Sequence, residues 1–534
     1  MVTSVVLTAF FIGLGIIGSQ AAWWVLVILA PFLILGWVDV LQKGDSIRRN
    51  FPIVGWGRQI AMWMRPKVFQ YFVEPDTEGR PFNKLQRSLV YSRSDGGVDT
   101  NPFGTQRNLY AEGYEWMNHS IAAIDHHDLP THPRTLIGGP DCKQPYDCSL
   151  LNVSAMSYGS LSGRACAALN GGAAIGDFAH NTGEGGVSPY HREYDGDLIY
   201  QIGTGYFGCR NKEGGFDPDL YAELATEDRI KMIELKLSQG AKPGHGGILP
   251  ASKVSDEIAE IRKIEKGKDV ISPPYHKEFD SPIGLLHLLK KMRDLSGGKP
   301  VGFKLCVGHQ AEFVSICKAM IHTGIKPDFI GVDGGEGGTG AAPLEFSNSV
   351  GTPYKEGLAF VYNTLEGFDL KKDIKLIAAG KIVSGFHIFK ALALGADACY
   401  SARAMMLALG CIQALECNQN TCPVGVASQD PALTKGLVVD DKKVKVANYH
   451  RKTIEAFNEL LGASGMRDLD MINRSHISRR ITETQTARFD QIYPYIPVGC
   501  LLQDDTVPES YKMAMRLSSA ETFLLHQPLS KLHL

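Results

Sequence analysis

The sequence predicts an α/β protein: a (β/α)8 TIM barrel with an N-terminal transmembrane helical hairpin and helical extensions. From about residue 150 onward, short apolar, β-branched segments alternate with helical patterns, as expected for buried parallel strands. Nearly every such segment runs directly into a Gly-rich or polar loop, and barrel enzymes place their chemistry in the loops that follow their strands. The first 38 residues contain no charged side chain. A doubly wound open sheet is the alternative to the barrel.

Length, charge and cysteine content exclude some classes of protein. The 534 residues are enough to bury a full core, and 55 Lys and Arg nearly balance 57 Asp and Glu, for a net charge of −2. Nucleic acid is therefore not an expected partner, because it requires a basic surface. Eleven cysteines are an odd number in a long chain, which indicates reduced thiols rather than a disulfide framework.

Residues 1–40 are predicted to be a membrane anchor. Two apolar segments, residues 2–17 and 21–38, are separated by "GSQ", and each is close to the roughly 20 residues that a spanning helix needs. A helical hairpin is the preferred interpretation, and one long tilted span is the second. A cleaved signal peptide lacks the necessary basic start here, and a buried core hairpin seldom lacks every charge.

Residues 41–140 are predicted to be a juxtamembrane and connecting segment. Basic residues remain on the cytoplasmic side and tryptophans favour the membrane interface. The expected location is therefore the inner (cytoplasmic) membrane, with the catalytic domain in the cytoplasm. Residues 55–69 either lie on the membrane surface or pack an apolar stripe on the main domain. Residues 74–110 are rich in Pro, Gly, Asp and Asn and are expected to have little regular structure. The basic and aromatic residues behind this orientation are Lys43, Arg48, Arg49, Arg58, Arg65, Lys67, Trp56 and Trp63.

Residues 141–436 are predicted to form the barrel, and residues 437–534 a C-terminal helical extension and tail. The expected strands are "LLNVSAM", "KMIELKL", "KPVGFKLCV", "PDFIGVDG", "IKLIAAG" and "ADACYSAR". Helical patterns between them include "SDEIAEIRKIEK", "GLLHLLKKMRDL", "AEFVSICKAMIHTG" and "GFHIFKALALG". In the extension, "KTIEAFNELLGASG" predicts a helix, followed by an irregular tail.

Two consecutive loops in the last third of the predicted barrel are suited to an anion. "VDGGEGGTGAAP" directly follows a strand, and glycines allow close approach of backbone N–H groups to a ligand. The next strand leads to Gly380 and Lys381, and a helix then opens at Ser384–Gly385. A phosphate between the last two loops, at a helix N-terminus, is a recurrent barrel site. A plain tight turn is the alternative for each loop taken alone.

Polar residues at other predicted strand ends are candidates for substrate contact. Lys304 lies within an apolar strand, where a lysine needs an anionic partner. His245 alone is more often a hydrogen-bonded structural histidine, and Glu184 could be an ordinary loop charge. The full set is Asn181, Thr182, Glu184, Gln201, Gln239, Lys242, His245, Lys304 and His309.

Three cysteines lie close together in "GCIQALECNQNTCPVG", at Cys411, Cys417 and Cys422. Three thiolates in a short loop can hold an iron–sulfur cluster with one corner missing. A structural zinc site usually has four ligands, often in CxxC pairs, and is the first alternative. Three inert thiols are the second.

Taken in order, these segments resemble the FMN-binding synthase domain of glutamate synthases, and within that family its short, membrane-tethered members. The similarity covers roughly residues 140–475, and the cysteine segment is its most specific part. The resemblance implies a (β/α)8 barrel carrying FMN, with a [3Fe–4S] cluster held by Cys411, Cys417 and Cys422. The motifs are "MSYGSLS", "NTGEGG", "QGAKPGHGG", "ISPPYH", "GGTGAAP" and "CNQNTCPVGVASQDP".

The same resemblance implies roles for individual residues. Gln201 and Lys304 would contact the polar edge of the flavin. The catalytic set would be Glu184, Gln239, Lys242 and Lys304, the first three facing the substrate. The remaining cofactor-binding residues would be Ser157, Gly159 and Ser160 at the isoalloxazine, and Gly338, Thr339, Gly340, Gly380, Gly385, Ala402 and Arg403 around the ribityl phosphate.

The activity implied is that of an oxidoreductase acting on CH–NH2 donors. In the family, 2-oxoglutarate and ammonia form 2-iminoglutarate, and reduced FMN delivers hydride to give L-glutamate. No GxGxxG follows a strand, so we expect an external electron donor such as ferredoxin, a reductase subunit or a membrane redox partner.

Three departures from the family pattern bear on this activity. A hydrophobic anchor, with Val2 as the second residue, stands where conventional members begin with a glutaminase domain. His245 replaces the usual glutamate of "KPGEGG", and Glu336 lies in "GGEGGTG" where "GHDGGTG" is usual. A membrane-anchored flavin/Fe–S electron-transfer or scaffold subunit, or an oxidoreductase of a related amino acid, is therefore the alternative function.

Overall fold

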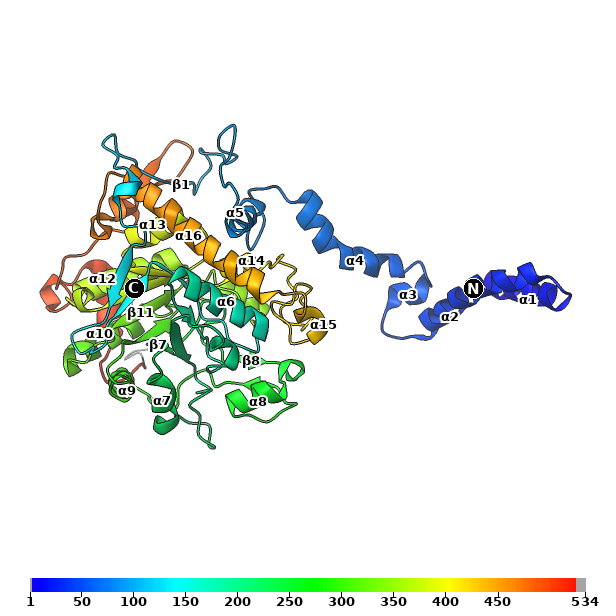
Figure 1. The fold of residues 1–534 in the computed structure, drawn as a ribbon, viewed down its shortest axis with the longest axis horizontal. Helices are drawn as coiled ribbons and strands as arrows, with labels where there is room; N and C mark the ends of the chain where they lie inside the picture. Colours follow the sequence, from blue (N-terminus) through cyan, green and yellow to red (C-terminus); the bar gives the residue numbers. More distant parts are fainter. Residues whose placement is uncertain (1, 525–534) are drawn as a thin grey trace. The chain divides into compact units, whose positions relative to one another are not determined.

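The structure is a computed structural model that describes residues 2–524, and it divides into two compact units, Met1–Lys84 and Leu85–Leu534. The second unit contains the barrel (Figure 1).

Eight parallel strands close into a barrel, which confirms the predicted fold class. The last strand in the chain pairs with the first, with Cys399 opposite Leu151. The strand Ile230–Lys236 is buried except at Lys231, and the strand Val301–Leu305 is wholly buried. Parallel strands covered on both faces require such burial. In spatial order the strands are β10 (Val301–Leu305), β11 (Phe329–Asp333), β12 (Lys375–Ala379), β13 (Ala398–Ser401), β4 (Leu151–Val153), β5 (His180–Asn181), β6 (Leu198–Ile202) and β7 (Ile230–Lys236).

Two of these strands, β5 and β6, were absent from the predicted set of apolar segments. β5 has only two residues, and both are polar, so no apolar run marks it. β6 carries Tyr200 and Gln201 in a fully buried strand.

Helices follow the strands on the outside of the barrel. Ser162 and Ser281 cap two of them by accepting hydrogen bonds from the backbone N–H groups of Ala165 and Gly284. The barrel helices are α6 (Gly163–Gly176), α7 (Pro218–Ala225), α9 (Pro282–Leu295), α10 (Gln310–Thr323), α12 (Tyr354–Gly367), α13 (Gly385–Ala393) and α14 (Arg403–Ala408). The β5–β6 connection contains the short 3-10 helix η3 (Pro189–His191).

A long insertion follows β7 and contains elements that do not belong to the regular barrel. It holds the antiparallel pair β8 (Ile248–Leu249) and β9 (Val270–Ile271), together with η4 (Ala251–Lys253) and α8 (Asp256–Arg262). The helical pattern predicted around residues 255–266 is therefore α8 of this insertion, and α9 is the barrel helix that leads to β10. A second short helix, α11 (Leu344–Ser349), lies in the loop after β11.

A β-hairpin closes the amino-terminal end of the barrel. It consists of β2 (Arg134–Ile137) and β3 (Tyr146–Ser149), directly before β4. Its apolar side chains Ile137, Tyr146 and Cys148 share one buried cluster with residues from the starts of several barrel strands.

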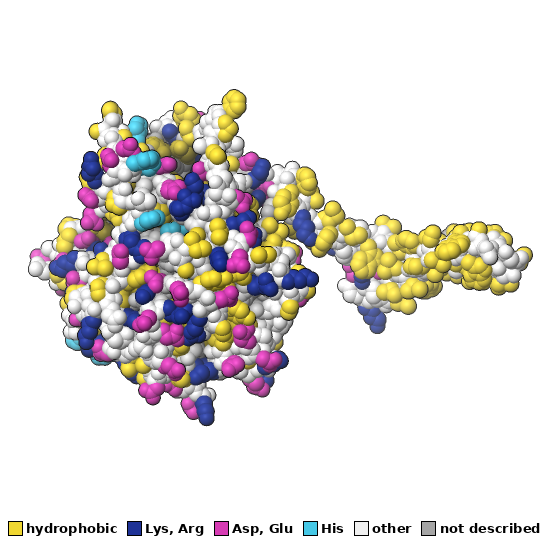
Figure 2. Space-filling model, in the orientation of Figure 1, with side chains coloured by type: hydrophobic (Ala, Val, Ile, Leu, Met, Phe, Trp, Pro, Cys, Tyr) yellow, Lys and Arg dark blue, Asp and Glu magenta, His cyan; other side chains and the backbone are white. Residues whose placement is uncertain are grey.

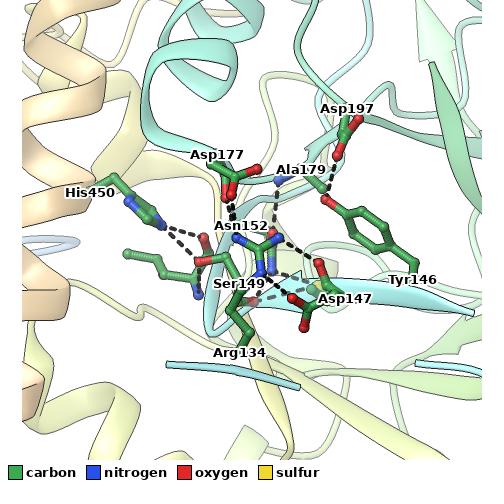
Figure 3. A network of polar contacts seen from close by, with 11 residues as sticks. Arg134, Tyr146, Asp147, Ser149, Asn152, Asp177, Ala179, Asp197 and His450 are labelled. Carbon is green, nitrogen blue, oxygen red and sulfur yellow. Dashed lines mark hydrogen bonds and ion pairs between the residues drawn. The ribbon is translucent and has the colours of Figure 1, made fainter. Parts of the chain in front are cut away.

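Polar contacts fix this base in place (Figure 3). The guanidinium of Arg134 pairs at 2.9 Å with Asp147 and at 2.9 Å with Asp177, which follows α6. The hydroxyl of Tyr146 donates to Asp197 at 2.9 Å, immediately before β6. The base is therefore occupied by structural contacts, which leaves the carboxyl end of the barrel for function.

The segment 74–110 contains the helix α5 (Lys84–Ser94), so the prediction of little regular structure was wrong there. The buried positions of α5 include Arg87 and Arg93, which hide the apolar periodicity that normally reveals a helix. Arg93 is held by Asp99 at 2.8 Å and donates to the Thr453 hydroxyl at 3.2 Å.

The C-terminal region is also more regular than predicted. Its helix α16 (Val439–Ala463) begins well before the predicted segment and lies beside α6 (Figure 1). The tail was predicted to be irregular, and this was wrong, because β14 (Ile477–Arg480) and β15 (Thr486–Arg488) form a three-stranded antiparallel sheet with β1 (Glu115–Met117). Three further helices are α15 (Pro431–Thr434), α17 (Phe489–Ile492) and α18 (Glu509–Leu517).

The first unit begins with two helices where the hairpin was predicted, α1 (Val2–Ile16) and α2 (Gln20–Leu41), and they pack against each other. Gly18, with φ of 110°, makes the turn between them in a conformation that disfavours other residues. α2 is long and apolar enough to cross a membrane, whereas α1 is shorter. Hydrophobic side chains cover both (Figure 2). Three elements follow, α3 (Ser46–Asn50), α4 (Trp56–Val68) and the π-helix η1 (Phe69–Val73).

Candidate functional site

The predicted site residues gather at the carboxyl end of the barrel. Gln201 and Lys304 lie within β6 and β10. The others follow the strand ends, in loops or, for Gly385 and Arg403, at the first residue of the next helix, and in a closed parallel barrel these segments meet on one face. They are Ser157, Gly159 and Ser160 after β4, Glu184 after β5, Gln239 and Lys242 after β7, Gly338, Thr339 and Gly340 after β11, Gly380 and Gly385 after β12, and Ala402 and Arg403 after β13.

A buried carboxylate orients two amides inside the barrel. Glu234 of β7 accepts hydrogen bonds at its Oε1 from Gln201 Nε2 at 2.6 Å and from Asn181 Nδ2 at 2.9 Å. Both amides therefore turn their NH2 groups, which are the donors, toward this oxygen. The Asn181 oxygen accepts from the Gly183 N–H at 3.0 Å. Glu234 Oε2 has no hydrogen-bond partner among the described residues and is buried.

Lys304 has the anionic partner that its position requires. Its Nζ lies 3.2 Å from Oδ2 of Asp333, at the end of β11. Burial works against the ammonium, but Asp333 and then Glu234 outweigh it and raise the pKa of Lys304. The Asp333 carboxylate also accepts from the Gly240 N–H at 2.9 Å, which ties down the loop after β7. Lys304 is therefore a fixed positive charge.

Glu184 and two lysines form a charged group over the strand ends. Glu184 Oε1 lies 2.7 Å from Nζ of Lys236, the last residue of β7. Burial opposes the ionised form of Glu184, but Lys236, and more weakly Lys242, hold the pKa of this carboxyl below its usual value. Lys242 is only 2% exposed and donates to the Gly246 carbonyl at 2.7 Å. Its burial lowers the pKa of Lys242 to about 8, so its ammonium can lose a proton near neutral pH.

Arg262, the last residue of α8, completes this group. It is buried and donates to the Tyr158 carbonyl at 2.8 Å, with the Ser157 hydroxyl at 3.4 Å. Burial lowers the pKa of Arg262 to about 10, and Glu184 opposes that shift. Three cations, from Lys236, Lys242 and Arg262, therefore surround one carboxylate, which leaves an excess of positive charge.

Glu336 and His245, the two loop residues that depart from the family pattern, have different surroundings. Glu336 accepts a hydrogen bond at 2.9 Å from the N–H of Tyr354, the first residue of α12, so its carboxylate satisfies a helix start. His245 Nδ1 lies 2.9 Å from the Gly246 carbonyl, which can only accept, so Nδ1 is the donor of this hydrogen bond. Its ring lies edge-on to Phe346, with the ring centres 5.1 Å apart.

The loop after β4 is compact. The hydroxyl oxygens of Ser157 and Ser160 are 3.0 Å apart, and the Ser160 hydroxyl donates to the Ser157 carbonyl at 2.7 Å. Gly159 has φ of 103°, and a Cβ there would lie 3.0 Å from the Arg262 guanidinium. The predicted Ser157–Ser160 segment and Arg262 are therefore in direct contact.

The Gly-rich loop after β11 lies close to two other predicted segments. A Cβ on Gly338 would lie 2.9 Å from Arg403 Nη1, and a Cβ on Gly340 would lie 3.0 Å from the Cys417 carbonyl oxygen. Arg403 donates to the Glu336 carbonyl. Thr339 lies between these two contacts, and Ala402 is the N-cap residue of α14.

Close packing leaves no room for a side chain at Gly380 or Gly385. A Cβ on Gly380 would lie 2.5 Å from the Tyr354 ring, and a Cβ on Gly385 would lie 2.5 Å from the backbone nitrogen of Phe457 in α16. Their predicted role at a phosphate remains a prediction.

The three cysteines of the predicted cluster share one environment. Cys422 is buried, and Cys411 and Cys417 are partly buried. Burial, with further contributions from the Cys417 and Cys422 thiols, raises the pKa of Cys411 to about 11. The pKa values of other buried thiols, such as Cys166 and Cys317, are raised by burial alone. The three thiols of the segment 411–422 therefore act on one another.

The spacing of these thiols bears on the choice of metal. Three thiolates on one zinc ion lie about 4 Å apart, because each Zn–S bond is about 2.3 Å long. Among the described residues, the group whose ligand atoms all lie within 4.8 Å of one another is Asp125, His126 and His127, and the three cysteines are not such a group. The zinc alternative is therefore not supported by the spacing of the thiols, and the iron–sulfur cluster stays a prediction.

Five charged residues at this end of the barrel were not predicted. Glu234 and Asp333 carried the same signal as Lys304, a charge within or at the end of an apolar strand. Lys236 ends the strand "MIELK", which also contains Glu234. The other two lie in the insertion after β7, whose fold no local pattern reveals. The five are Glu234, Lys236, Lys253, Arg262 and Asp333.

Comparisons with known proteins show what the chain is similar to. A family model described as a conserved region in glutamate synthase matches residues 142–467. The glutamate synthase large subunit-like protein YerD of Bacillus subtilis is 36% identical over 507 residues, which cover 87% of this chain and 96% of that protein. An archaeal-type glutamate synthase (NADPH) of Thermotoga neapolitana is 36% identical over 321 residues, which cover 60% of each chain. Among solved structures, a mutant flavocytochrome b2 with pyruvate bound has a TM-score of 0.41 and 14% identity, over 77% of this chain and 82% of that one.

Proposed function

The chain belongs to the glutamate synthase family, and from that premise we propose that it is an FMN- and iron–sulfur-dependent oxidoreductase that reductively aminates 2-oxoglutarate to L-glutamate. Ammonia condenses with the keto group to give 2-iminoglutarate and water, and a hydride and a proton then convert the imine to the amine. The observation that carries the proposal is the group of Lys236, Lys242 and Arg262 around Glu184, at the barrel end that also holds Lys304.

The residues present fit a flavin. Because Glu234 engages the NH2 group of Gln201, the Gln201 oxygen is left to accept from a donor such as the flavin N3–H. Lys304 supplies a fixed positive charge, which favours a reduced, anionic ring. Arg403 and the side-chain-free backbone of Gly338 and Gly340 suit a phosphate. Bound FMN would supply the hydride chemistry.

The charges also fit a keto dicarboxylate. Lys236, Lys242 and Arg262 provide three cations against one carboxylate, which matches the two negative charges of 2-oxoglutarate. Arg262 is the best suited to a carboxylate, because a guanidinium can bind both of its oxygens. Lys242, with its pKa near 8, can hold or release a proton at Nζ as the keto oxygen leaves as water and as the imine gains hydride.

The three thiols fit an iron–sulfur cluster, which would pass single electrons to the flavin. Cys411, Cys417 and Cys422 would hold it, through the loop that Gly340 approaches. We propose an external electron donor, such as ferredoxin, a reductase subunit or a membrane redox partner. The apolar helix α2 and the basic residues that follow it support attachment to the inner (cytoplasmic) membrane, with the barrel on the cytoplasmic side.

A single-turnover experiment tests this proposal. The full chain, purified in detergent without oxygen and reduced with dithionite, is mixed with ammonium and 2-oxoglutarate. We expect flavin reoxidation and one equivalent of glutamate per flavin. A flavin that stays reduced while no glutamate forms would rule out synthase activity and favour an electron-transfer or scaffold subunit. Reoxidation by a different keto acid would instead point to a related amino acid.

A further inference from the structure

A buried lysine holds the cysteine segment from outside. Lys253 ends η4 in the insertion after β7 and is 4% exposed. Its Nζ donates to the Cys417 carbonyl at 2.8 Å and to the Ala427 carbonyl at 3.0 Å. The two carbonyls lie on either side of Cys422 in the chain, so one ammonium closes the loop that carries two of the three thiols.

The Lys253 ammonium is hydrogen-bonded directly to the backbone of Cys417, one of the three proposed ligand residues, so it brings a cation to the cysteine loop. Two other contacts fix the same segment without adding a charge: the Tyr91 hydroxyl donates to the Cys411 carbonyl at 2.7 Å, and Gly340 packs against Cys417.

We propose that Lys253 is a positioning residue for the iron–sulfur cluster, which fixes the Cys417–Ala427 loop and stabilises the reduced cluster with its positive charge. This inference rests on the proposed function, since it requires that the cluster is present. Reduction adds one electron and therefore one negative charge to the cluster, so a nearby buried cation favours the reduced form and makes the midpoint potential more positive.

Lys253 also connects two parts of the proposed site. The insertion that carries it also carries Lys242 and Arg262, the proposed substrate-binding cations. Lys253 therefore links the substrate-binding segment to the cluster loop through two direct hydrogen bonds.

The chain offers a closely matched control. Lys299 is also buried, at 6% exposed, and its Nζ donates to two backbone carbonyls, of Ala225 at 2.8 Å and Glu227 at 2.7 Å. It lies just before the start of β10, at the opposite end of the barrel from the cysteine loop. Lys299→Met thus removes the same kind of buried ammonium far from the proposed cluster.

The test is an EPR-monitored redox titration of the full chain, purified without oxygen, with iron and FMN contents measured on each variant. We expect Lys253→Met to shift the cluster midpoint to a more negative potential and to lower the iron content, whereas Lys253→Arg and Lys299→Met keep the wild-type potential. Lys253→Gln retains donor groups without the charge and should show the negative shift even if Lys253→Met does not assemble a cluster.

Two negative results are distinguishable. A wild-type protein that contains no iron–sulfur cluster would overturn the proposed function, and this inference with it. A wild-type protein with a cluster whose potential is unchanged in Lys253→Gln and Lys253→Met, or changed equally in Lys299→Met, would overturn the role of Lys253 alone.

Discussion

Glu234 orients two neighbouring side chains of the site without itself having to touch a substrate. Its Oε1 accepts from both Gln201 and Asn181, and that shared acceptor fixes which face of each amide is turned toward the barrel mouth. The other oxygen, Oε2, is buried with no hydrogen-bond partner among the described residues, which costs stability, whereas Oε1 orients both neighbouring amides.

We therefore expect Glu234→Gln to weaken FMN binding about tenfold. An amide at position 234 can donate or accept, so Gln201 is no longer held with its oxygen toward the flavin, and a charge-assisted hydrogen bond is worth roughly 1.5–3 kcal/mol. FMN affinity is measured by fluorescence titration of the apoprotein. Glu312→Gln, on the outer helix α10, is the control and should bind FMN normally. Equal affinities in both variants would contradict this role for Glu234.

The pKa of Lys242, lowered to about 8 by burial, predicts a pH dependence of substrate binding. The ammonium is charged below that pH and neutral above it, so affinity for 2-oxoglutarate should fall as the pH rises from about 7 to about 9. Lys242→Arg keeps the charge throughout this range and should remove the fall, while Lys242→Met should bind weakly at every pH. The dissociation constant is read from flavin absorbance changes. A fall that persists unchanged in Lys242→Arg would assign it to another group.

At the residue scale, the sequence reveals a site residue when a polar or charged side chain stands in an apolar segment. Lys304 could be found because it is a charged side chain within an apolar strand, and Glu234 could have been found in the same way, whereas Gln201 was found at a predicted strand end. Arg262 and Lys253 could not, because their importance depends on how the insertion after β7 folds back over the barrel mouth.

Among the elements, those with a regular apolar pattern were predictable and those with polar buried faces were not. β10, β11 and β12 are almost wholly apolar, whereas β5 is the dipeptide His180–Asn181 and α5 buries two arginines. Local patterns report burial only when the buried residues are apolar. The missing information is therefore tertiary: the Asn181 amide of β5 is paired with Glu234, and Arg93 of α5 is paired with Asp99.

The contact between α13 and α16 predicts the effect of a single methyl group. In Gly385→Ala the new Cβ would lie 2.5 Å from the Phe457 backbone nitrogen, so the helices must move apart, at a cost of about 1–3 kcal/mol. Gly357→Ala, in α12, is the control, because its new Cβ would meet only ordinary contacts from 3.6 Å. Thermal unfolding should show a lower Tm for Gly385→Ala and an equal or higher Tm for Gly357→Ala.

The same pair of variants also separates packing from ligand binding. If Gly385 is glycine for packing alone, folded Gly385→Ala should bind FMN with normal affinity. A normal Tm with a large loss of FMN affinity would instead favour its predicted place beside the phosphate.

For the whole molecule, the two compact units differ in their surfaces. The barrel unit carries charges of both signs, whereas hydrophobic side chains cover α1 and α2 (Figure 2). α2 ends in a polar cluster: the Asp39 carboxylate is completely buried and accepts from the Ile53 N–H at 2.9 Å and the Trp56 indole N–H at 3.1 Å, with Arg48 3.7 Å away. Such a cluster is what a membrane helix needs at the point where it leaves the hydrocarbon, because an acidic group there must be paired.

The barrel followed from the sequence because six of its eight strands carry a local apolar signal. A test of the membrane assignment must separate lipid contact from general hydrophobicity. The outward-facing residues Val27 and Ile34 of α2 are 63% and 65% exposed and lie two helical turns apart, so both would face lipid in a spanning helix.

We expect the double variant Val27→Arg and Ile34→Arg to abolish stable membrane association. Each arginine near the centre of a spanning helix costs roughly 2.5–3.5 kcal/mol, which together exceeds the margin of a single helix of this length. The full chain is expressed, and its fraction in alkali-washed membranes is measured by immunoblot. Val444→Arg, at an exposed position of α16, adds a charge to the barrel unit and should remain with the membrane as the wild type does. Wild-type protein that alkali releases, or a double variant that stays in the washed membranes, would show that α2 does not span the bilayer.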